Sequence, residues 1–208
     1  MKRKLFIAIG CFVLGLGIYQ LLPRTTYIDV NESTAYMSLE EMVCKADLIL
    51  EGTVQQSMES QWDISETGET LDTMHTDVQI TPENTLLSEE KDSSVLVRTH
   101  IGEIDRTIQT SSSYPTLSEG EQVLLFLDTS NDPSEPYAIL GSSQGKFTLT
   151  EQDGESVYSN GRDVIPVSDW KDTLQQIAAE YADTEWPSDY YTPEEIKEMN
   201  DALFHVNQ

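Results

Sequence analysis

The sequence has little cysteine, and this scarcity excludes a fold that is held together by disulfides. It contains two cysteines, Cys11 and Cys44, among 208 residues. Cys11 lies inside a long hydrophobic run near the N-terminus, so the two thiols are poorly placed to pair, and Cys44 is expected to stay a free thiol. The domain must therefore depend on a hydrophobic core, for which 38% of hydrophobic residues is sufficient.

Basic residues are also scarce, and their distribution leaves most of the chain strongly acidic. There are 12 lysines and arginines against 37 aspartates and glutamates, a net charge of −25 at pH 7. Four of the basic residues precede Thr25 and no acidic residue does, so from Thr25 onward eight basic and 37 acidic residues leave a net charge of −29. Such a charge repels phosphate backbones and anionic lipid headgroups. We expect no nucleic-acid partner; a basic or neutral protein, a basic peptide or Ca²⁺ remains compatible.

Motifs that carry catalysis or bind a metal are missing as well. There is no Gly-x-Ser-x-Gly sequence of a serine hydrolase. His75 and His100 fall in expected strands, where Asp77 or Glu103 could join them in a metal site, but their spacing matches no zinc signature. The loop at 128–132 carries side-chain oxygens without the spacing or terminal Glu of an EF-hand, which predicts no more than weak Ca²⁺ binding. We therefore expect no catalytic, cofactor-binding or metal-ligating residue, and a chain that is not an enzyme.

A hydrophobic run near the N-terminus indicates attachment to a membrane. Residues 5–22 are apolar except for Tyr19 and Gln20, and as a helix they would rise about 27 Å, close to the thickness of the hydrocarbon core. Three basic residues at positions 2–4 outnumber Arg24 on the far side, which predicts a cytoplasmic N-terminus. We interpret residues 1–23 as one transmembrane anchor in the cell membrane. Two alternatives remain open: a lipoprotein modified at Cys11, and a cleaved signal peptide that leads to secretion.

The polar residues 24–37 predict a tether, and residues 38–167 predict one β-structured domain. Ser38 and Glu41 form a capping box that begins a short amphipathic helix. Residues 74–80 alternate between apolar and polar side chains, as in a half-buried strand. Further strands are expected at 48–54, 95–101, 123–127 and 137–140.

A hairpin and two helices are expected in the last part of the chain. Asp153-Gly154 is a turn signal that joins strands at 146–150 and 156–158. Apolar residues at helical spacing, from Trp170 to Tyr181 and from Ile196 to Phe204, predict two C-terminal helices within residues 168–208, packed on the domain.

Three segments carry a resemblance to known proteins. They are Ala46 to Val54, Gly120 to Leu127, and Gln144 to Phe147. Their order resembles a group of uncharacterised secreted or membrane-anchored proteins of Gram-positive bacteria. It is also similar to the OB-fold barrel of tissue-inhibitor-of-metalloproteinase and netrin-like domains. The disulfide-linked N-terminal cysteine with which those inhibitors bind zinc has no counterpart here, so the resemblance implies a fold and no inhibitory site.

The patterns and the resemblance together predict a mainly β (α+β) fold. We expect a small Greek-key OB-like barrel with an N-terminal helix, an extra β-hairpin and two C-terminal helices, preceded by one transmembrane helix.

Trp62 is the one residue that we single out for contact with a partner. It is the only aromatic residue in the polar, acidic stretch 55–73, which we expect to be a loop. An exposed tryptophan on such a loop marks a contact site, whereas the alternative is that it folds back onto the barrel. We expect a membrane-anchored, extracytoplasmic, non-catalytic binding module for a basic or neutral protein or peptide. The alternatives are a Ca²⁺-responsive acidic envelope protein and an unrecognised hydrolase.

Overall fold

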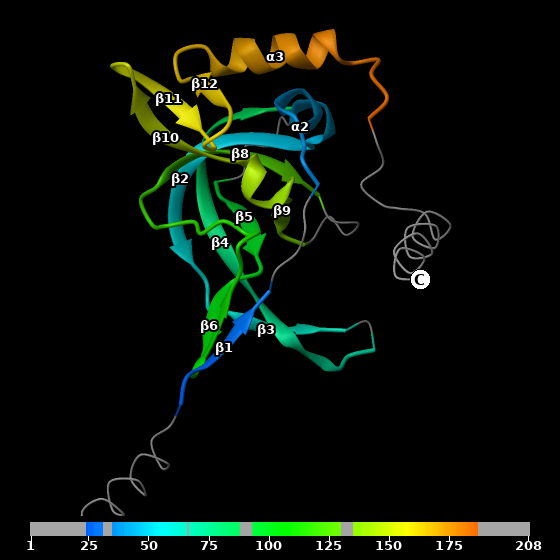
Figure 1. The fold of residues 1–208 in the computed structure, drawn as a ribbon, viewed down its shortest axis with the longest axis vertical. Helices are drawn as coiled ribbons and strands as arrows, with labels where there is room; N and C mark the ends of the chain where they lie inside the picture. Colours follow the sequence, from blue (N-terminus) through cyan, green and yellow to red (C-terminus); the bar gives the residue numbers. More distant parts are fainter. Residues whose placement is uncertain (1–23, 31–34, 66, 88–92, 130–134, 187–208) are drawn as a thin grey trace, which may run out of the picture.

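The computed structural model describes residues 24–30, 35–65, 67–87, 93–129 and 135–186 (Figure 1). The predicted anchor at 1–23 and the predicted last helix, from Ile196 to Phe204, lie outside these residues. Within them, no helix is both long enough and apolar enough to cross a bilayer.

Five strands form a closed barrel at the centre of the molecule (Figure 1). They are β2 (Leu48–Ser57), β4 (Thr70–Leu86), β5 (Val95–Thr99), β8 (Gln122–Asp128) and β9 (Tyr137–Ile139). Around the barrel the order is β8, β2, β4, β5, β9 and back to β8, and only β5 and β9 are parallel neighbours. The prediction of a mainly β fold is confirmed, and this arrangement is consistent with an OB-like barrel.

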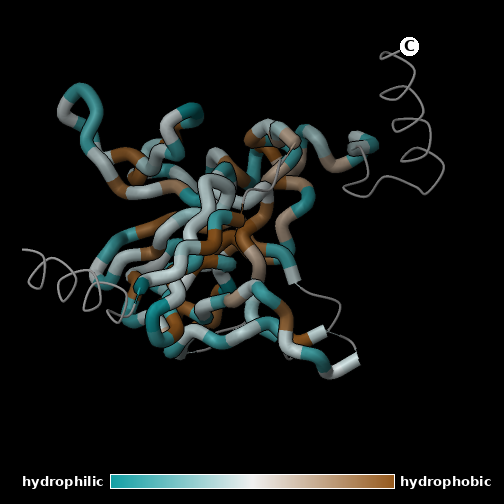
Figure 2. Tube along the Cα trace, turned by 60° about the horizontal axis from the view of Figure 1, so that its bottom comes forward, coloured by the Kyte–Doolittle hydropathy of each residue, from teal (hydrophilic) through white to brown (hydrophobic). Residues whose placement is uncertain are grey.

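The central strand β8 separates two hydrophobic clusters. Its residues 123–127 are all fully buried, as their continuous apolar run predicts. Side chains alternate along a strand, so Leu125 contributes to the cluster inside the barrel, while Leu124 and Phe126 contribute to a second cluster on the other face. Figure 2 shows hydrophobic residues gathered along the central strands and hydrophilic residues in the outer turns.

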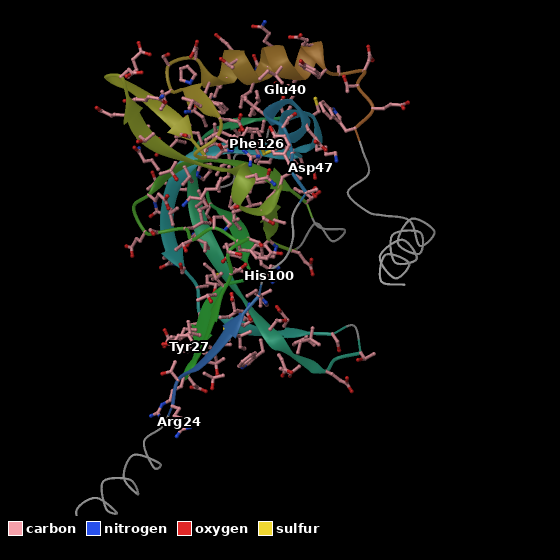
Figure 3. The ribbon with its side chains drawn as sticks, viewed as in Figure 1. Arg24, Tyr27, Glu40, Asp47, His100 and Phe126 are labelled. Carbon is pink, nitrogen blue, oxygen red and sulfur yellow. The ribbon has the colours of Figure 1, made fainter. Side chains whose placement is uncertain are left out.

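A small three-stranded sheet lies beside the barrel at the end where the described chain begins. It consists of β1 (Thr26–Asp29), β7 (Thr107–Thr110) and β6 (Gly102–Ile104), with β1 and β7 parallel. Figure 3 shows Arg24 and Tyr27 at this end. The expectation that residues 24–37 form a tether is therefore wrong for β1, whose β-branched Thr26 and Ile28 suit a strand.

The stretch 55–73 is a correction of the same kind. It was expected to be a loop, but β2 continues to Ser57, β3 (Gln61–Ile64) follows, and β4 already begins at Thr70. A register shift between Trp62 and Ile64 interrupts the regular pairing of β3 with β4. Because of this shift and the polar composition of the stretch, the residues of β3 do not show the regular alternation that predicts a strand.

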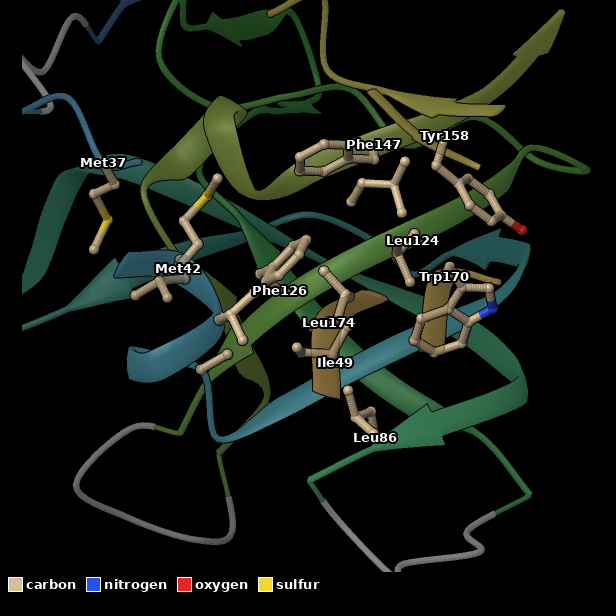
Figure 4. Close-up of a cluster of buried hydrophobic side chains, with 14 residues drawn as sticks. Met37, Met42, Ile49, Leu86, Leu124, Phe126, Phe147, Tyr158, Trp170 and Leu174 are labelled. Carbon is tan, nitrogen blue, oxygen red and sulfur yellow. The ribbon is translucent and has the colours of Figure 1, made fainter. Parts of the chain in front are cut away.

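Two helices cover the second hydrophobic cluster. Helix α2 (Leu39–Lys45) begins at Ser38, whose Oγ accepts a hydrogen bond from the amide of Glu41 at 3.2 Å, and this confirms the predicted cap. Helix α3 (Trp170–Glu180) packs against α2, and the second predicted C-terminal helix lies outside the described residues. The free Cys44 is half-buried on α2. Figure 4 shows this cluster, in which Met42 of α2 and Trp170 of α3 lie with the rings of Phe126, Phe147 and Tyr158.

The predicted extra hairpin is formed by β10 (Lys146–Gln152) and β11 (Glu155–Ser159), and β12 (Val164–Pro166) extends it. Asp153 and Gly154 both have positive φ, at 53° and 84°, as a two-residue hairpin turn of type I′ requires.

Gln144 attaches the segment before α2 to the domain. It lies in the short 3₁₀ helix η1 (Ser142–Gly145). Its side-chain oxygen accepts from the amide of Met37 at 3.1 Å, and its side-chain nitrogen donates to the carbonyl oxygen of Ala35 at 2.8 Å. The guanidinium of Arg162 lies 4.3 Å from the ring centre of Tyr36 and holds the same segment.

Candidate functional site

The beginning of β4 and its partner β3 form a two-stranded projection, which we call the arm (residues 61–65 and 67–75). β4 has 17 residues, but it pairs with β5 and β2 only from residue 76 onward. Residues 70–75 therefore extend past the barrel, and β3 pairs with them there. Figure 1 shows the arm leaving the barrel at the end opposite α3.

Asp63 of β3 joins the arm to two histidines at its root. The Oδ1 atom of Asp63 lies 2.5 Å from Nδ1 of His75, and its Oδ2 atom lies 4.0 Å from Nδ1 of His100. The hydroxyl of Thr73 donates a further hydrogen bond to Oδ2 at 2.6 Å. The ring of His100 packs against that of Tyr114, with the ring centres 4.8 Å apart. The carboxylate of Asp63 thus contacts β4, through Thr73 and His75, and lies close to His100, which follows β5.

The surroundings of Asp63 favour its charged form. The exposed fraction of the side chain is 18% for Asp63, 13% for His75 and 38% for His100. Burial acts to raise the pKa of Asp63, but hydrogen bonds from Thr73 and His75, with the charges of the two imidazoles, outweigh it and hold that pKa below its usual value. The carboxylate therefore stabilises the arm as an anion.

The sequence predicted part of this cluster. His75 and His100 fall beside each other at the root of the arm, and the carboxylate between them is Asp63, not Asp77 or Glu103. Asp77 instead accepts two hydrogen bonds from the guanidinium of Arg98, at 2.8 and 3.0 Å. Asp63 was missed because its stretch was expected to be a loop.

Metal binding remains without direct support at this cluster. Among the residues that the structure describes, no group of three or more His, Cys, Asp or Glu side chains is arranged to hold a metal ion. Most of the loop at 128–132 lies outside the described residues, so the expectation of weak Ca²⁺ binding there stays a prediction.

Gln109 of β7 supports the arm from the side of the small sheet. Its side chain is buried, with 2% of the residue exposed. Its Oε1 accepts a hydrogen bond from the amide of Met74 at 2.9 Å. Its Nε2 donates to the carbonyl oxygens of Met74 at 2.6 Å and of His100 at 2.9 Å. The side-chain amide of Gln109 thereby pairs with the backbone of Met74 in β4 as a neighbouring strand would. Buried backbone groups need such hydrogen-bond partners.

Ser60, directly before β3, joins the arm to β6. Its Oγ forms a hydrogen bond with Oγ1 of Thr76 at 2.8 Å and accepts another from the amide of Glu103 at 3.1 Å. Gly102 fits closely against these groups, because a Cβ atom there would lie 2.4 Å from Oγ of Ser60. The barrel, the arm and the small sheet therefore share one tightly packed junction.

The outer part of the arm exposes apolar side chains among acidic ones. Ile64 is 70% exposed and Leu71 is 43% exposed. Trp62, the predicted contact residue, lies half-buried on β3 opposite Met74 rather than in a loop. Exposed apolar residues on a projection are typical of a contact region.

The cluster is arranged to hold the arm in place. The hydroxyls beside it donate to protein oxygens: that of Thr73 to Asp63, and that of Thr76 to the carbonyl oxygen of Ile101 at 2.7 Å. The geometry thus favours a fixed projection with an exposed outer part.

A scan of the chain against models of protein families finds no match, and a search of curated proteins returns no significant match.

Proposed function

We propose that the chain is a membrane-anchored, extracytoplasmic binding module that contacts a basic or neutral protein or peptide through its arm. The observation that carries this proposal is the contrast within the arm. Its root is fixed by Asp63, His75 and Gln109, while Ile64 and Leu71 are exposed farther out.

A fixed root favours binding because little conformational freedom is lost when a partner docks. Ordering a flexible loop on binding costs about 0.5–1.5 kcal/mol for each side chain that becomes immobile. The hydrogen bonds at Asp63, and those of Gln109 to the backbone of Met74, already order the arm when the chain folds, so this cost does not fall on binding. Trp62, Ile64 and Leu71 then stand on an arm that is already formed before a partner docks.

The charge of the arm sets the kind of partner. Glu59, Glu69 and Asp72 are exposed on or beside it, and the chain from Thr25 onward carries a net charge of −29. Opposite charge on a partner accelerates association and disfavours acidic competitors. A basic or neutral protein segment with apolar side chains therefore fits this surface.

Site-specific photo-cross-linking tests the proposal in cells of the source organism. A photoreactive amino acid replaces Ile64 on the arm or, as the matched control, Gln175, which is exposed on α3. We expect a discrete protein adduct from position 64 and none of that size from position 175.

Substitutions then show whether the adduct depends on the arm. Leu71→Asp is expected to reduce its yield, whereas Leu96→Asp, an equal change at an exposed residue of β5, leaves it unchanged. Equal adducts at positions 64 and 175, or none at 64, would contradict the proposed function.

A further inference from the structure

The arm lies at the same end of the molecule as the beginning of the described chain. Figure 3 shows Arg24 and Tyr27 at this end, with His100 between them and the barrel and Glu40 at the opposite end. The small sheet stands beside the arm there (Figure 1).

A continuous row of contacts connects β1 to the root of the arm. Tyr27 of β1 pairs with Ile108 of β7, and Ile108 pairs with Glu103 of β6. The amide of Glu103 donates to Oγ of Ser60, which precedes β3. Neighbouring strands are about 4.8 Å apart, so Ser60 lies within about 15 Å of β1.

The hydrophobic run ends close to β1 in the sequence. Its last residue is Leu22, and β1 begins at Thr26. Four residues span at most about 14 Å even when fully extended. If residues 5–22 cross the membrane, β1 cannot lie farther than this from the end of the span, and the root of the arm is fixed beside β1.

The barrel and the helices lie farther from the beginning of the described chain than the small sheet and the root of the arm do (Figure 1). The arm itself adds little reach, since residues 61–68 extend at most about 25 Å from Ser60. A partner that contacts Ile64 must therefore come near the bilayer surface.

We infer that the partner of the arm is a protein held in, or on the outer face of, the same membrane, with a basic or neutral segment at that level. This inference rests on the proposed function and names the class of partner. A protein fits better than the bilayer itself, because Glu59, Glu69 and Asp72 are exposed on or beside the arm and anionic headgroups repel them.

Raising the domain away from the membrane tests the inference in the full chain. A rigid proline-rich spacer of about 20 residues, inserted between Arg24 and Thr25, lifts the domain by about 60 Å. The same spacer added after Gln208 is the matched control, because it changes composition and not height. Thermal unfolding of both variants shows that the domain still folds, and the photoreactive residue is again placed at position 64.

We expect the N-terminal spacer to lower the yield of the protein adduct at least about fivefold, because a partner in the membrane can no longer reach the arm. The C-terminal spacer should leave the yield unchanged. An adduct that persists at full yield above the N-terminal spacer overturns the inference and leaves the proposed function standing. An adduct to lipid in place of protein overturns the inference, and the absence of any adduct in the chain without a spacer overturns the proposed function as well.

Discussion

Replacing Asp63 with asparagine keeps the shape of the side chain at the root of the arm and removes its charge. In the native chain the carboxylate accepts hydrogen bonds from Thr73 and His75 and lies 4.0 Å from Nδ1 of His100. Hydrogen bonds to charged groups contribute about 1.5–3 kcal/mol each, against about 1 kcal/mol for neutral ones. Because solvent reaches part of the cluster, we expect Asp63→Asn to lower the free energy of unfolding at pH 7 by about 1–2 kcal/mol.

The effect of this substitution should depend on pH. The folded pKa of Asp63 is lower than its unfolded value, which is near 3.9 for an ordinary aspartate. The stabilisation from the charged carboxylate is therefore complete above the unfolded pKa and is lost as the pH falls through the folded pKa. The native chain and the variant should show the full difference at pH 5 and at pH 7, and they should converge as the pH falls toward 2.

Urea unfolding followed by tryptophan fluorescence measures this difference at pH 7, 5, 3 and 2, and amide hydrogen exchange reports whether residues 61–64 open more often. Asp72→Asn is the matched control, because Asp72 is exposed on the same arm. Equal stability of the two variants at pH 7 would refute the role of Asp63 at the root. A loss from Asp63→Asn that is unchanged from pH 7 to pH 2 would refute the electrostatic explanation.

Three further substitutions test the packing around the site and the core. Gly102→Ala should destabilise the chain by about 1–3 kcal/mol, because its Cβ would lie 2.4 Å from Oγ of Ser60; an unchanged melting temperature would contradict the close fit. Gln109→Leu should leave the amide and carbonyl of Met74 without their partner, at about 1–3 kcal/mol for each group, and should speed hydrogen exchange at the Met74 amide; native exchange there would show that Gln109 does not support the arm. Phe126→Ala should cost about 3–5 kcal/mol in urea unfolding, because it opens a cavity beside Phe147; a loss under about 1 kcal/mol would contradict the central place of this ring.

The barrel could be predicted from the sequence because its strands have simple patterns. The uninterrupted apolar run at 123–127 is a strand buried on both faces, and the alternation at 74–80 is a strand with one buried face. The cap at Ser38 and the turn at Asp153-Gly154 depend on local chemistry and were predicted for that reason.

The arm and the small sheet could not be predicted in the same way. Asp63 and Trp62 lie in a strand whose residues are polar and whose pairing contains a register shift, so no regular period marks it. β1 has four residues and gains its stability from a partner some 80 positions away, Thr107–Thr110, which no local pattern reveals. The sequence placed the two histidines in strands, but the carboxylate between them, Asp63, lies in β3, which the sequence did not predict.

The parallel pairing of β1 with β7 has a mechanical consequence for a chain pulled from its N-terminus. Tension applied before Arg24 reaches β1 first and loads its four paired residues along the strand direction. It next reaches the segment that Gln144 and Arg162 hold, and only then α2 and the barrel. Two attachments in series therefore stand between an external force and the barrel, so a pull that detaches β1 lengthens the connection before it unfolds the domain.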